Sequence, residues 1–159
     1  NNFLYVIGIS LLVFNLFNFR KRARCFAGDV GAVSIAFIIV FLLGKLMVET
    51  GNPTFIIILM VYGVDSILTI IHRLILKENI FQAHRKHLYQ IMSNELKIPH
   101  TTVSLIYMAV QGVIMVGYFV FMNLYPSASL WIYFLAVATV LAGVYVWFMK
   151  RYFKLHKKN

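Results

Sequence analysis

The sequence predicts an all-α protein that crosses a membrane several times. Of its 159 residues, 61% are hydrophobic, whereas a soluble domain has roughly 45–50% apolar residues. The apolar residues are gathered in blocks close to the roughly 20 residues that one helix needs to cross a bilayer. The mean hydropathy of +0.81 points the same way. We therefore expect a multi-pass transmembrane helix bundle that forms a single transmembrane domain.

Five apolar blocks predict five spanning helices. We place them at residues 3–19, 30–48, 54–71, 101–125 and 129–149. The sequence GNP at 51–53 and the sequence YPS at 125–127 predict tight turns between neighbouring spans. The apolar block at the beginning of the chain carries no charged segment before it, so we expect no cleavable signal peptide.

The basic residues are distributed unevenly between the connections. Fourteen of the fifteen Lys and Arg residues fall in three segments, at 20–28, 72–100 and 150–159. Cytoplasmic loops of membrane proteins carry an excess of Lys and Arg. We expect these two loops and the tail to be cytoplasmic, with the N-terminus outside and the C-terminus inside. Topology thus accounts for the net charge of +10, and no nucleic-acid partner is expected.

The connection at 72–100 is longer than most loops, and long loops are often functional. Phe81, Leu88, Ile91 and Leu96 are spaced roughly like one face of a helix. We expect a short amphipathic helix in this loop, lying against the membrane surface or against the bundle.

Asp29 is one of five acidic residues in the chain, and it lies between Gly28 and Gly31. The glycines allow close approach of a phosphate-sized group, and the first turn of a helix favours anions. Mg²⁺ typically binds through one or two carboxylates together with substrate phosphates. The pattern therefore indicates a metal and phosphate site. The alternative is that Asp29 is the N-cap of the second span, a common role for Asp.

The sequence AHRKHLY at 83–89 is a second candidate site. Arg85 can bind a phosphate with two hydrogen bonds. His87 can donate to a phosphate or move a proton near neutral pH, and His84 shares its face if the segment is helical. The alternative is a basic surface segment that contacts lipid headgroups.

Asp65 lies within the third predicted span, where an ionisable residue suggests function. One hypothesis is a transporter or ion-coupled membrane subunit that uses Asp65. The alternative is a structural partner for another helix. A non-catalytic protein whose basic loops bind anionic lipid is a further possibility.

Three motifs of the chain resemble those of one known enzyme family. The residues NF at 18–19 and FAGDVGA at 26–32 resemble the N-F and F-M-G-D-x-G-S signature of that family. The residues VDS at 64–66 and IHRL at 71–74 resemble its D-T/S and R-R-L stretch. The sequence NIFQAHRKHL at 79–88 resembles its F-x-A-D-R-x-H-L-H-H loop. The motifs occur in the family's order, and the family they resemble is that of the polyprenyl-phosphate N-acetylhexosamine-1-phosphate transferases.

The resemblance implies a membrane enzyme of glycosyltransferase family 4. Such an enzyme transfers N-acetylhexosamine-1-phosphate from a UDP-sugar to undecaprenyl phosphate and releases UMP. This reaction starts cell-envelope glycan synthesis, including lipopolysaccharide and cell wall, at the bacterial inner membrane. N-acetylglucosamine is the expected sugar, and a homodimer is left open.

The resemblance also implies roles for individual residues. Asp29 is the implied catalytic residue and the ligand for Mg²⁺, with Mn²⁺ as the alternative ion. Asn18, Gly28 and Gly31 are implied substrate-binding residues near it. The residues His84, Arg85 and His87 are implied to bind the nucleotide sugar from the cytoplasmic loop.

The sequence departs from the family at several positions. Ala32 replaces the usual Ser, His84 replaces an Asp, and Tyr89 and Gln90 replace the last two histidines of the loop. An Asp-Asp motif and an N-x-x-N-x-x-D-G motif, which precede these motifs in the family, do not occur in this sequence. We therefore expect a C-terminal half of such an enzyme, inactive alone.

Overall fold

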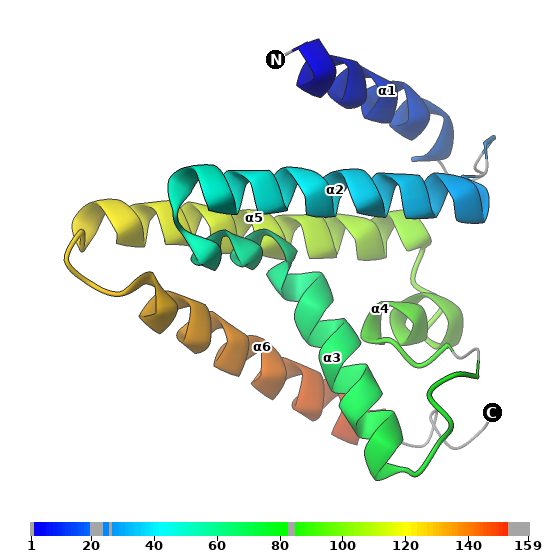
Figure 1. Cartoon of the computed structure of the whole chain (residues 1–159). Helices are drawn as coiled ribbons and strands as arrows, with labels where there is room; N and C mark the ends of the chain where they lie inside the picture. The colour runs from blue at the N-terminus through cyan, green and yellow to red at the C-terminus, as the bar shows by residue number, and fades with distance from the viewer. Residues whose placement is uncertain (1, 20–23, 26, 83–84, 153–159) are drawn as a thin grey trace. The chain divides into compact units, whose positions relative to one another are not determined.

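The computed structural model describes residues 2–19, 24–25, 27–82 and 85–152. All regular secondary structure in these ranges is helical, which confirms the predicted all-α class (Figure 1). Four segments of these ranges are long and apolar enough to cross a membrane: Gly28–Thr50, Pro53–Ile75, His100–Leu124 and Leu130–Arg151. Helix α1 (Asn2–Asn18) is also apolar but shorter, with 17 residues.

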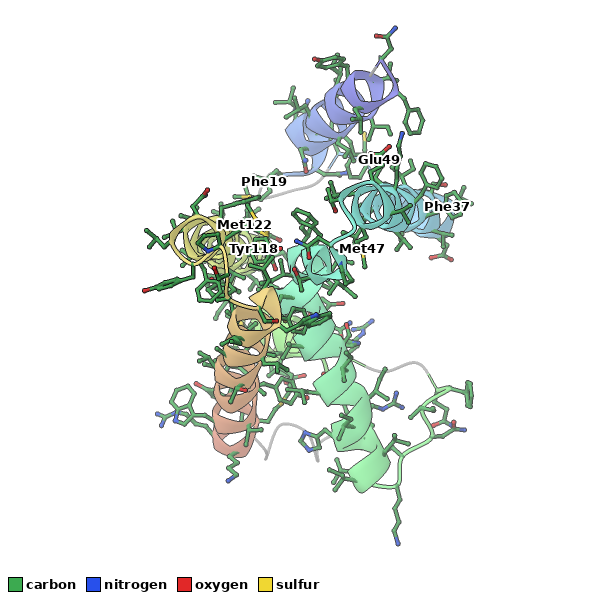
Figure 2. All side chains as sticks on the ribbon, turned by 60° about the vertical axis from the view of Figure 1, so that its left-hand side comes forward. Phe19, Phe37, Met47, Glu49, Tyr118 and Met122 are labelled. Carbon is green, nitrogen blue, oxygen red and sulfur yellow. The ribbon has the colours of Figure 1, made fainter. Side chains whose placement is uncertain are left out.

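The chain divides into two compact units, Asn1–Leu46 and Met47–Asn159. The first unit contains α1 and most of α2 (Gly28–Thr50), and no residue of either helix is buried. Its side chains are mainly apolar and exposed. An example is Phe37 of α2, whose side chain projects outward from the helix (Figure 2). Apolar helices with so little buried surface are typical of segments surrounded by lipid or by other protein.

The second unit is built around a long helical segment and a helical hairpin. The segment consists of a 3₁₀-helix η1 (Pro53–Leu59) that continues directly into α3 (Met60–Ile75). The hairpin consists of α5 (His100–Leu124) and α6 (Leu130–Arg151), joined by residues 125–129, which include the turn predicted at 125–127. Helix α3 packs against both helices of the hairpin (Figure 1).

Local chemistry explains the first turn of this unit. Gly51 has a φ of +63°, a left-handed conformation that suits glycine. Asn52 is the N-cap of η1, and its side chain accepts a hydrogen bond from the backbone N–H of Thr54. Pro53 occupies the first helical position, where a missing N–H costs nothing. The turn predicted at 51–53 is therefore confirmed.

Two buried clusters hold the second unit together. The first contains Ile57, Met60, Ile114 and Tyr118, and it joins η1 and α3 to α5. In Figure 2, Tyr118 lies on α5 among side chains of neighbouring helices. The second cluster contains Ile91, Tyr145 and Met149.

The second cluster includes the short helix expected in the long connection. Helix α4 (Leu88–Gln90) continues as one π-helical turn, η2 (Ile91–Glu95). Ile91 is 3% exposed and packs with α6, so this helix lies against the bundle. The predicted helix extended back to Phe81, but Phe81 is 92% exposed and lies outside it.

The observed helix boundaries differ from the predicted spans by one or two residues, except at the end of the third span. We expected the third span to end at residue 71, but α3 continues to Ile75. The loop predicted at 72–100 therefore begins at 76. The basic residues at 20–23 and in the tail at 153–159 lie outside the described residues.

Candidate functional site

Asp29 lies in the first turn of α2, which begins at Gly28, and its side chain is exposed. Because the helix begins before Asp29, the residue lies inside the first turn and not at the N-cap position. The free N–H groups and the helix dipole favour a carboxylate or a bound anion at this point. The structure thus presents an exposed carboxylate at the beginning of an apolar helix.

The structure also describes the other predicted residues of this region, Gly28, Gly31 and Asn18. Gly28 has a φ of +63°, which a side chain at this position would strain. A Cβ atom on Gly31 would lie 3.2 Å from the Cβ of Ala27, a tight contact. Asn18 is the last residue of α1, and its side-chain oxygen is shielded from solvent without a hydrogen-bond donor from the described residues.

Asp65 is the polar centre of the second unit, and its side chain is 5% exposed. Its carboxylate accepts hydrogen bonds from the backbone N–H of Leu88 at 2.9 Å and from the hydroxyl of Tyr107 at 2.9 Å. The backbone N–H of Tyr89 at 3.5 Å and the hydroxyl of Thr69 at 3.3 Å complete the set. One carboxylate therefore joins α3 to α5 and to the beginning of α4.

This arrangement fixes the position of His87, which directly precedes α4. The His87 backbone N–H donates to the side-chain oxygen of Gln90 at 3.3 Å. Its imidazole Nδ1 lies 4.0 Å from the carboxylate of Asp65. The imidazole also stacks on the ring of Tyr89, with centroids 5.6 Å apart and planes inclined by 19°. His87 is thus held at the boundary between the loop and the bundle.

Three tyrosines pack around the carboxylate of Asp65. The rings of Tyr62, Tyr89 and Tyr107 contact one another, with centroid distances of 5.7, 5.9 and 6.2 Å. Burial raises the pKa of the Tyr89 phenol, and the nearby Tyr62 and Asp65 raise it further. Tyr89 therefore remains neutral at physiological pH, and it supplies an aromatic surface and a hydroxyl group.

A Schellman motif ends α3 and begins the loop. The backbone N–H of Glu78 donates to the carbonyl of Arg73 at 3.0 Å, and that of Lys77 donates to Leu74 at 3.0 Å. Lys77 has a φ of 57°, at the position where glycine is usual. This turn brings the side chain of Glu78 back onto the end of α3.

Arg73 organises the loop that follows this turn. Its side chain is buried, and its Nε donates to the carboxylate of Glu78 at 3.2 Å. The other guanidinium nitrogens donate to the carbonyl groups of Asn79, Ile80 and Gln82. A planar guanidinium with five donors can satisfy all of these acceptors together.

Glu78 extends this network to the far side of the loop, because it also pairs with Lys86. The hydrogen bond from Lys86 holds the pKa of Glu78 below its usual value, and Arg73 acts in the same direction. The loop is therefore held at one end by Arg73 and Glu78 and at the other by Asp65.

The structure places the predicted loop residues at the outer side of this network. Arg85 is exposed, and His87 is partly buried. His84 lies outside the described residues. Asp29 belongs to the first unit and Arg85 and His87 belong to the second, so the structure describes two separate parts of the predicted site. Within the described residues, no group of three or more His, Cys, Asp or Glu side chains could hold a metal ion.

The supporting roles of Arg73, Glu78 and Tyr107 were not predicted from the sequence. A signal for part of this set was present. Asp65, Thr69 and Arg73 recur at intervals of four residues, so they share one face of α3, and all three are buried. A polar stripe of this kind inside a span indicates a buried network.

Comparisons with protein-family models, with curated proteins and with solved structures found no significant match.

Proposed function

We propose that this chain forms part of an enzyme that transfers an N-acetylhexosamine-1-phosphate group from a UDP-sugar to a polyprenyl phosphate. In this reaction an oxygen of the lipid phosphate attacks the β-phosphorus of the nucleotide sugar, and the bond to UMP breaks. The products are a polyprenyl-pyrophosphoryl sugar and UMP. Positioning and electrostatic stabilisation supply most of the catalysis in reactions of this type.

One observation carries the proposal: Asp29, the acidic residue of the first motif, is exposed in the first turn of an apolar helix. A carboxylate there can share a divalent cation with substrate phosphates while the helix terminus favours anions. Mg²⁺ bound at this point would neutralise phosphate oxygens. Asp29 alone offers few protein ligands, which agrees with a site that other carboxylates complete.

The loop of the second unit supports the same proposal. Arg85 is exposed and suits a phosphate oxygen, and His87, two residues later in the sequence, is held in place. Asp65 and Arg73 direct their polar groups to the loop backbone. Because Asp65 already accepts four hydrogen bonds from the protein, its geometry favours a supporting role over an ion-transport role.

The expected topology also agrees. The segments Gly28–Thr50 and Pro53–Ile75 are each long enough to cross a bilayer, and a turn joins them. Two consecutive spans return the chain to the side on which the first began. Asp29 and the loop after Ile75 would then meet the same aqueous phase, which is where a water-soluble UDP-sugar and a lipid phosphate have to meet.

The test is UMP release from UDP-N-acetylglucosamine and polyprenyl phosphate. The assay uses membranes that contain the protein expressed from its full-length gene. We expect Asp29→Asn to lower UMP release by about 100-fold or more, as for loss of a group that stabilises transition-state charge. Glu95→Gln is the matched control, since Glu95 is also exposed and acidic. It should retain activity.

Two outcomes would contradict the proposal. Undiminished UMP release by Asp29→Asn would remove Asp29 from the mechanism. Absence of UMP release with any UDP-amino sugar, in protein shown to be folded in the membrane, would remove the activity itself.

A further inference from the structure

A groove of about 500 Å³ runs along the surface between α3 and α6. Leu68, Ile71 and Ile75 form its wall on α3, and Val146 lines it on α6. Ile71, Ile75 and Val146 are 45–73% exposed, so the wall is open to the surroundings. Met149, which is 3% exposed, forms part of the floor. The volume lies within the range of about 300–1,000 Å³ that is typical of small-molecule sites.

One end of this groove carries polar groups that match an anion. Lys150 lines the groove at the last turn of α6, and His72 lines it close to the end of α3. Both residues lie at the ends of membrane-length segments, Leu130–Arg151 and Pro53–Ile75. Helix ends of this kind lie at the level of lipid headgroups, where Lys attracts anionic lipid.

A second groove in the same unit shows what the first would be without these groups. It lies between α5 and α6 and has nearly the same volume, about 520 Å³. Its lining is apolar apart from the hydroxyl of Tyr133, and it contains no charged side chain. Such a groove accommodates a hydrocarbon chain without preference for a headgroup. The charge at the end of the α3–α6 groove therefore distinguishes the two.

We propose that the α3–α6 groove is a binding site for an anionic phospholipid. One acyl chain lies along Leu68, Ile71 and Val146, toward the middle of the two helices, and the headgroup phosphate contacts the ammonium group of Lys150 and the imidazole of His72. The groove lining includes none of the predicted site residues Asp29, Arg85 and His87, and the proposal does not depend on the proposed transferase activity.

Native mass spectrometry of the full chain tests the site. The chain is purified in detergent and supplied with equal amounts of dioleoyl-phosphatidylglycerol and dioleoyl-phosphatidylcholine, and the ratio of the two lipids retained by the protein is measured. We expect Lys150→Gln to lower the ratio of anionic to zwitterionic lipid by roughly fivefold, the effect of one basic residue near a headgroup. Arg151→Gln, which removes the same charge one residue further along outside the groove lining, should change the ratio much less.

A second pair of variants tests the apolar part of the groove. Val146→Trp fills the α3–α6 groove and should reduce retention of phosphatidylglycerol while Lys150 is still present. Val140→Trp fills the α5–α6 groove and should leave the lipid ratio unchanged. Equal effects of Lys150→Gln and Arg151→Gln, equal effects of the two Trp variants, or a lipid-free dimer in the mass spectrum would each overturn the proposal. The last result would show a second copy in place of the lipid.

Discussion

The second unit contains two buried hydrogen-bond networks, and the two networks differ in charge. In the neutral network, Asn52, Thr54 and Tyr118 are joined by hydrogen bonds of 2.6–3.0 Å between neutral groups. In the charged network, the carboxylate of Asp65 accepts four hydrogen bonds, two of them from backbone N–H groups. The neutral network joins a short turn to α5, whereas the charged network anchors a long loop.

The difference follows from the length of the segment that each network holds in place. A turn of two residues already restricts the chain, so neutral hydrogen bonds with a net value of about 0.5–1.5 kcal/mol each suffice. The loop after α3 is long, and closing it costs more conformational entropy. Hydrogen bonds to charged groups contribute about 1.5–3 kcal/mol each. The loop with the predicted substrate-binding residues is therefore the one held by Asp65, Arg73 and Glu78.

The largest effect is expected for Asp65→Asn, which keeps the shape of the side chain but removes the charge. It leaves buried donors of Tyr107 and Leu88 poorly satisfied, so we expect the free energy of unfolding to fall by about 3 kcal/mol. Steady-state unfolding in detergent mixtures measures this change. Hydrogen exchange should also accelerate at the amides of Leu88 and Ile91.

Tyr107→Phe serves as the partial control for that variant, because it removes one hydroxyl donor and leaves the carboxylate. We expect about one third of the loss and slower amide exchange than in Asp65→Asn. Unchanged exchange at Leu88 in Asp65→Asn would show that the carboxylate does not anchor the loop.

Most of the fold could be predicted from the sequence, because the bilayer imposes a length on each apolar block. The third span was predicted too short for a definite physical reason. His72 and Arg73 resemble the polar end of a helix, but the guanidinium of Arg73 is buried and satisfied by loop carbonyl groups and Glu78. Those partners come from residues that follow the helix, and apolar periodicity cannot reveal them.

The short helix of the loop illustrates the same limit. Its existence could be predicted from the spacing of Leu88 and Ile91, but its start could not. Helix α4 begins where the carboxylate of Asp65 meets the N–H groups of Leu88 and Tyr89, and Asp65 lies far away in sequence. The roles of Asp29, Arg85 and His87 remain predictions, since the two units are described separately.

A smaller effect on stability is expected for a substitution in the neutral network. Thr54→Val keeps the shape of the side chain but removes the hydroxyl that contacts Asn52 and Tyr118. We expect the free energy of unfolding to fall by about 1 kcal/mol, with no change in amide exchange at Leu88. The same detergent unfolding and exchange measurements apply. Accelerated exchange at Leu88 in Thr54→Val would mean that the two networks are coupled and do not act independently.

The smallest effect is expected for Glu78, and it depends on pH. Lys86 and Arg73 hold the pKa of Glu78 below its usual value of 4.5, so the carboxylate stabilises the folded loop above that pH. This contribution is lost as the pH falls through the lowered pKa of the folded state, because protonation then removes both ion pairs. Since Glu78 is partly exposed, we expect less than about 1 kcal/mol. Hydrogen exchange of the amides at 79–82 between pH 6 and about pH 3, corrected for the intrinsic exchange rates, should show the loss in the wild type. Glu78→Gln and Lys86→Gln should both flatten the profile, and a wild-type profile in Glu78→Gln would assign the pH dependence to another group.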